Sequence, residues 1–163
     1  QNPGNYWEDL ALLLYDTSSK GYNPKESASL KEDIARHRLG LGLSQSDLEK
    51  RLVVVNAGAE PDKNMGYGVK PIIIPGITIV YPHEMLNKTG ENYKFDYGLD
   101  KGMPSVAQLG NGKRTIYMPS EKSDIGLRVL YRNRNLDLGA GSRNLANDNE
   151  SGRVNFAPQA HSP

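Results

Sequence analysis

Apolar and β-branched residues are most concentrated in residues 69–82 of the sequence. Isoleucine and valine are stiff at χ1 and pack well on a pleated sheet, so this run predicts two short strands, at residues 69–74 and 77–81. Proline cannot donate to a strand ladder, so Pro71 and Pro75 confine the backbone to an edge, a bulge or a strand start. Pro75 and the glycine after it predict a turn. We expect this run to be the spine of a β-rich domain.

Residues 5–14 carry the pattern of a first helix. Asn5 can cap it with Glu8 at its third position, which is a capping-box arrangement. Apolar residues then fall on one helix face at positions i, i+3, i+4 and i+7. These residues are Trp7, Leu10, Ala11 and Leu14.

A second helix is predicted to begin with Asn23 as N-cap, Pro24 at the first position and Glu26 at the third. Its inner face carries Leu30 and Ile34. Glycines at positions 40 and 42 predict the end of the helical segment.

A third helix has the strongest local signals. Ser44 is its predicted cap, Asp47 occupies its third position, and Leu43 with Leu48 fits a hydrophobic staple. The valines at 53–55 either extend this helix or begin a strand.

Residues 56–68 are rich in Gly, Asn, Asp and Pro and predict a loop, followed by a β-rich segment to residue 132. Asn111 and the glycine after it predict a two-residue hairpin between the second and third of four further strands. These candidate strands cover residues 93–97, 105–109, 114–118 and 126–131. Strands at this spacing favour an antiparallel sheet or a small barrel.

From residue 133 onward the chain has few apolar side chains to bury, which predicts an extended C-terminal arm held by neighbouring chains. The expected fold class is α+β, with a short N-terminal helical subdomain, an antiparallel sheet or small barrel, and this arm. The predicted parts are residues 1–55, 56–68, 69–132 and 133–163.

Composition narrows the functional classes. The chain has 163 residues and a net charge of +1, so no bulk field attracts nucleic acid, which is not the favoured partner. It has no cysteine, which removes disulfides, thiolate nucleophiles and cysteine-based zinc sites. No apolar run approaches the roughly 20 residues that span a bilayer. We expect no cofactor and no metal.

An arginine- and asparagine-rich run near the C-terminal end is the strongest candidate for a binding surface. In a strand, Arg128, Arg132 and Arg134 alternate onto one face, where guanidinium groups bind carboxylate or phosphate bidentately. The alternative is a solvated strand face balanced by neighbouring aspartates. The candidate interface residues are Arg128, Tyr131, Arg132, Arg134 and Arg143.

His83 and Glu84 stand together near a predicted strand end. A histidine and a carboxylate can serve as base and acid, as nuclease chemistry requires. The alternative is an isolated surface histidine, because nothing in the sequence fixes the geometry of the pair.

Residues 34–52 include a Gly-Leu-Ser-Gln turn between two helical segments and resemble the opening of a phage-repressor-type helix-turn-helix. That family would imply a recognition helix directly afterwards, with its first residues at base edges. The residues that follow, 53–61, are Val-Val-Val-Asn-Ala-Gly-Ala-Glu-Pro and do not suit a helix.

Two functions therefore lead. The first is a non-enzymatic structural or binding subunit of a larger assembly of the virion or envelope-complex type, with other protein subunits as homo- or hetero-oligomeric partners. A virion or extracytoplasmic location would suit it. The second is a small hydrolase or nuclease-type toxin domain that uses His83 and Glu84 near an arginine-lined face. Helix-turn-helix DNA binding is a distant third.

Overall fold

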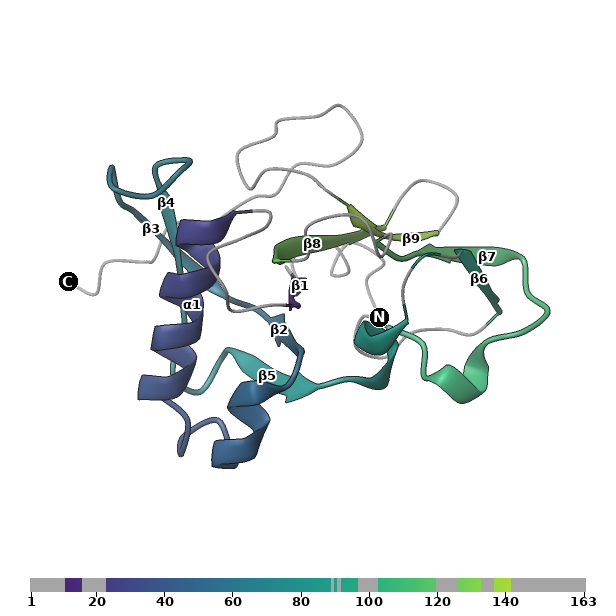
Figure 1. Cartoon of the computed structure of the whole chain (residues 1–163), viewed down its shortest axis with the longest axis horizontal. Helices are drawn as coiled ribbons and strands as arrows, with labels where there is room; N and C mark the ends of the chain where they lie inside the picture. Colours follow the sequence, from purple (N-terminus) through teal and green to yellow (C-terminus); the bar gives the residue numbers. More distant parts are fainter. Residues whose placement is uncertain are drawn as a thin grey trace.

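The computed structural model describes residues 11–15, 23–88, 90, 92–96, 103–119, 126–132 and 137–141. Within them, one α-helix, α1 (Pro24–Arg36), lies beside two β-sheets (Figure 1). The first strands are β1 (Ala11–Leu14), β2 (Leu52–Val55), β3 (Gly58–Pro61), β4 (Val69–Ile72) and β5 (Ile79–Pro82). The later strands are β6 (Asn92–Phe95), β7 (Arg114–Tyr117), β8 (Leu127–Arg132) and β9 (Leu138–Gly141). Short 3-10 helices are η2 (Gln45–Glu49), η3 (Glu84–Asn87) and η4 (Val106–Gln108). The α+β fold class is confirmed.

The larger sheet has seven strands in the order β5-β2-β1-β8-β9-β7-β6. All neighbours pair antiparallel except β7 and β9, which are parallel. The second sheet is a hairpin of β3 and β4, and β4 packs against α1.

Both faces of the larger sheet are covered by apolar side chains. Alternate residues of a strand point to opposite faces. Leu12 and Leu14 therefore join α1 residues Leu30 and Ile34 in one cluster, while Ala11 belongs to the other. The second cluster includes Met85 and Leu86 of η3 and Phe95 of β6. Strands buried on both faces read as continuous apolar runs, which explains the Leu-Leu-Leu and Val-Val-Val sequences of β1 and β2.

Several predicted elements are confirmed. Helix α1 begins at Pro24 after Asn23, and its inner residues Leu30 and Ile34 are fully buried. Ser44 and Asp47 form the predicted capping box, although the element they start is a 3-10 helix. The valines at 53–55 form a strand, and the turn after Pro75 is present.

Other predictions are wrong. Ala11 and Leu14 belong to a strand, because a leucine-rich run satisfies a strand pairing between β2 and β8 as well as a helix face. Residues 58–61, expected in a loop, form β3, and residues 138–141, expected in an extended arm, form β9 inside the sheet. Residues 105–109 contain η4, so β7 pairs with β6 and the predicted hairpin is absent there. Residues 69–82 do not form the spine of one sheet, because β4 lies in the smaller sheet and β5 at one end of the larger one. The strand β1 is an inner strand of the larger sheet.

The first helix prediction before residue 11 and the arm after residue 141 lie outside the described residues. The predicted four-part division of the chain remains a prediction.

Candidate functional site

His83 and Glu84 lie beside a hollow of about 330 Å³ at the end of β5. His83 is the N-cap of η3, and Glu84 is the first residue of that helix. Two cations, Lys50 and Arg51, lie in the same wall. The lining residues are Glu49, Lys50, Arg51, Pro82, His83, Glu84 and Asn87. The structure thus places the predicted pair beside positive charge.

The hydrogen bonds of this pair are structural. His83 Nδ1 accepts from the backbone N–H of Met85 at 3.1 Å, so neutral His83 carries its proton on Nε2. A general base needs an available lone pair, and this contact uses it. Burial lowers the pKa of His83 below its ordinary value, against the opposing effect of Glu84. Glu84 Oε1 in turn accepts from the backbone N–H of Val106 at 2.7 Å and ties η3 to η4.

The neighbouring cations also have partners. Arg51 donates to the carbonyl oxygen of Leu86 at 2.6 Å, and its guanidinium carbon lies 5.7 Å from the centre of the Tyr15 ring. Lys50 donates to Asp47 at 2.7 Å. This contact, with those from Ser44, lowers the pKa of Asp47 to about 2.

The first arginine of the predicted binding face on β8, Arg128, is not on the surface. Arg128 is buried, where it opposes Leu13 of β1, and its charge lies close enough to Tyr15 to affect that phenol. Burial raises the pKa of Tyr15, and Arg128 partly offsets the rise. Arg128 is therefore a core residue and not a surface ligand.

The other predicted interface residues are only partly located. The backbones of Tyr131 and Arg132 belong to β8, opposite Gly139 and Leu138 of β9. Their side chains, and all of Arg134 and Arg143, lie outside the described residues.

A surface that the sequence did not predict lies near the other end of β5, where α1 ends and the turn before β5 begins. Leu39 is 81% exposed, Ile77 is 55% exposed and Ile79 is 42% exposed. We call these three residues the apolar corner. Leu39 lines a second hollow, and Ile77 directly follows Gly76, which lines it too.

This second hollow has a volume of about 440 Å³ and lies between the C-terminal end of α1 and the turn before β5. Its lining residues are Ala35, Arg36, His37, Arg38, Leu39, Gly40, Leu41, Ile73, Pro75 and Gly76. Leu39, Leu41, Ile73 and Pro75 supply apolar surface, and the basic side chains lie on the helix end. Of these described residues, none is acidic.

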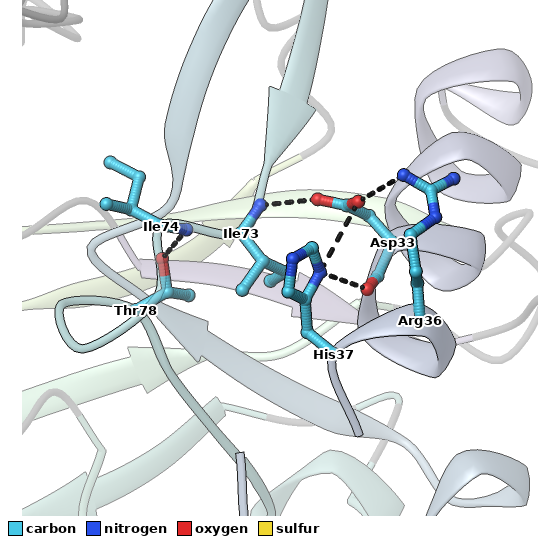
Figure 2. A network of polar contacts seen from close by, with 6 residues as sticks. All are labelled: Asp33, Arg36, His37, Ile73, Ile74 and Thr78. Carbon is cyan, nitrogen blue, oxygen red and sulfur yellow. Dashed lines mark hydrogen bonds and ion pairs between the residues drawn. The ribbon is translucent and has the colours of Figure 1, made fainter. Parts of the chain in front are cut away.

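A buried carboxylate holds the two walls of this hollow together (Figure 2). Asp33 Oδ2 accepts from the backbone N–H of Ile73 at 2.7 Å. Asp33 Oδ1 lies 3.0 Å from Arg36 Nη1 and 3.5 Å from His37 Nδ1. On the other wall, Thr78 accepts from the backbone N–H of Ile74 at 2.8 Å. Hydrogen bonds as well as packing therefore hold the end of α1 and the turn before β5 in place on the two sides of the hollow.

The two ends of the larger sheet differ. Leu109 bridges to Phe95 of β6, and the N–H of Gly110 donates to Lys94 O at 2.9 Å, so the outer edge of β6 is partly covered. In the described part of the chain, no strand pairs with the outer edge of β5. The β5 sequence Ile-Val-Tyr-Pro has no charged residue, whereas β6 contains Lys94.

Comparisons with known proteins find no matching family model, no similar curated protein and no similar solved structure. Among the described residues, no group of three or more His, Cys, Asp or Glu side chains is placed to hold a metal ion. None of the described helices combines the length and apolar composition needed to cross a membrane.

Proposed function

We propose that this protein is a non-enzymatic structural or binding subunit of a larger protein assembly. The observation that carries the proposal is the exposure of Ile77 and Ile79 at β5, which is the last strand of the larger sheet in the described part of the chain. An exposed, apolar edge strand is a template for pairing with another chain. Natural proteins protect such edges with charge, proline, bulges or coverage. At β6 this role falls to Lys94 and residues 109–110, whereas β5 ends in Pro82 and carries no charge.

The partner in this proposal is another protein subunit, identical or different, that adds a strand or packs an apolar face at β5. The assembly type, a virion or envelope complex, rests on the tyrosine-, glycine- and proline-rich β sequence. The part of the predicted arm that follows β9, after residue 141, belongs to the same proposal as a second contact.

Light scattering tests this proposal. We expect a discrete oligomer for the unaltered chain and a lower mass for Ile79→Lys, because a charge on an edge strand opposes pairing. Tyr117→Lys is the matched control, since Tyr117 is 44% exposed but lies on β7, between β9 and β6. A chain that stays monomeric at every concentration contradicts the proposal. Limited proteolysis of residues after 141 then tests whether the oligomer protects the arm.

The hollow at His83 favours a second function, a hydrolase or nuclease-type domain. Its cations Lys50 and Arg51 could contact phosphate, and the Nε2–H of His83 could donate a hydrogen bond to a phosphate oxygen. The contacts of His83 and Glu84 with backbone N–H groups make this the weaker candidate. Cleavage of RNA or DNA that is abolished in His83→Ala supports it, and cleavage retained in that variant removes it.

DNA binding of the helix-turn-helix type has the least support. The resemblance requires a helix after residue 52, and the chain has β2 there.

A further inference from the structure

We propose that the hollow between the end of α1 and the turn before β5 binds an acidic, apolar peptide segment of a partner subunit. This inference rests on the proposed assembly function and names the chemistry of the partner. The hollow offers about 440 Å³, its described lining has no acidic residue, and it combines basic side chains with exposed apolar ones.

The basic groups are already held in place. Arg36 donates to Asp33 through Nη1 at 3.0 Å, and Arg38 donates to the carbonyl oxygen of Leu43 through Nη1 at 3.0 Å. A guanidinium has five N–H groups, so each arginine keeps donors for a carboxylate. Because internal contacts already restrain both side chains, binding costs less conformational entropy than it would for mobile lysines.

The helix terminus explains part of this arrangement. Cations near a helix C-terminus interact favourably with its dipole, so Arg36 and Arg38 have a structural role as well. That role does not explain Leu39, which is 81% exposed beside them. An apolar side chain at that exposure next to two cations fits a ligand that brings both an apolar group and a negative charge.

The adjoining edge supports an extended peptide. The turn that lines the hollow leads directly into β5, which is the last strand of the larger sheet in the described part of the chain. A segment that adds to this edge is extended, and its alternate side chains face the same side. Such a segment could place an apolar side chain and a carboxylate toward the hollow.

Fluorescence anisotropy with labelled eight-residue peptides tests the proposal. In each probe the two named residues lie two positions apart with serine between them, so that both side chains face the same side of an extended chain. The probes are a leucine–aspartate peptide, a leucine–lysine peptide and a serine–aspartate peptide. We expect the leucine–aspartate peptide to bind at least about tenfold more tightly than the other two, because only it offers both groups. Equal binding of the leucine–lysine peptide overturns the proposal. Binding of phosphatidylglycerol vesicles without peptide binding also overturns it, in favour of a lipid surface.

Variants locate the site. We expect Arg36→Gln, Arg38→Gln and Leu39→Ser each to weaken binding by about tenfold, and Arg38→Lys to weaken it less, because lysine keeps the charge but not the restrained guanidinium. Lys63→Gln and Tyr117→Ser are controls for charge and exposed apolar surface elsewhere, and thermal melting checks that each variant is folded. Unchanged binding in all three site variants overturns the proposal.

The peptide-binding proposal can fail while the assembly proposal holds, and the experiments distinguish the two results. If light scattering shows an oligomer that Ile79→Lys disrupts while the leucine–aspartate peptide does not bind, the assembly proposal holds and this one fails.

Discussion

Asp33 is the residue that joins α1 to the backbone just after β4. It is buried, and it accepts from Ile73 N–H at 2.7 Å while Arg36 and His37 contact its other oxygen (Figure 2). Asp33→Ala leaves that buried N–H without a partner. We expect a loss of about 1–3 kcal/mol in the free energy of unfolding, measured by urea denaturation.

Glu32→Ala is the matched control for Asp33, because Glu32 is the preceding residue of the same helix and is exposed. Its effect should stay within about 0.5 kcal/mol. Equal losses in the two variants would show that the contact with Ile73 contributes nothing to stability.

His83 should make stability depend on pH. Burial lowers its pKa in the folded chain below the ordinary 6.5, while Glu84 acts in the opposite direction. Below about pH 6.5 the unfolded chain takes up a proton that folded His83 takes up only at lower pH, so the free energy of unfolding falls as the pH drops. Above that pH both states are neutral at this residue, and its contribution is fully present.

His83→Asn tests this effect, since asparagine keeps an acceptor for the Met85 N–H. Urea denaturation at about pH 7.5 and about pH 5.5 should show a smaller loss of stability for the variant than for the unaltered chain. An unchanged difference between the two pH values would assign the dependence to other groups.

At the scale of elements, Gly112 lets the segment before β7 approach the backbone at the end of β6 closely. A Cβ at this position would overlap the carbonyl carbon and oxygen of Phe95 at the end of β6. The backbone around Phe95 is paired with β7 and with Leu109, so it cannot move without loss of pairing. We expect Gly112→Ala to lower the free energy of unfolding by about 1–3 kcal/mol in urea denaturation.

Gly40→Ala is the control for this prediction. A Cβ at Gly40 would meet its nearest neighbour, the carbonyl oxygen of His37, at 3.6 Å, which is ordinary contact. A neutral or slightly stabilising effect is expected there. Similar losses at both glycines would point to backbone conformation and not to the approach at Phe95.

The elements that could be predicted from the sequence are those decided by near neighbours. The capping box of Ser44 and Asp47 and the start of α1 at Pro24 depend on residues within one turn. Strand β1 could not be predicted, because its conformation depends on β2 and β8, which are far away along the chain. Long-range pairing overrides the helical spacing of Ala11 and Leu14.

In the candidate site, too, features set by neighbouring residues could be predicted, and features set by distant residues could not. His83 and Glu84 stand together in the sequence and could be singled out, but their backbone partners at Met85 and Val106 required the fold. The apolar corner could not be predicted, since a leucine in a glycine-rich turn gives no sign of its exposure. For Arg128 the sequence suggested an exposed binding face, and the residue is buried. Alternation along a strand shows which residues share a face, but it does not show whether that face is covered.

At the scale of the whole molecule, β1 connects parts of the chain that are far apart in sequence. It pairs with β2 on one side and with β8 on the other, so β2 and β5 share one sheet with the later strands β6 to β9 (Figure 1). A shared sheet with a core on both faces favours cooperative unfolding.

Leu12→Ala tests this cooperativity. Leu12 is fully buried at the centre of β1, and its truncation should cost about 2–5 kcal/mol. Hydrogen exchange by mass spectrometry should then report the same loss of protection in peptides that cover β2 and β7, because both open with the sheet. Leu39→Ala, at an exposed position, should change neither. A loss confined to β2 would mean that the chain unfolds in parts, as the predicted division at residues 56–68 implies.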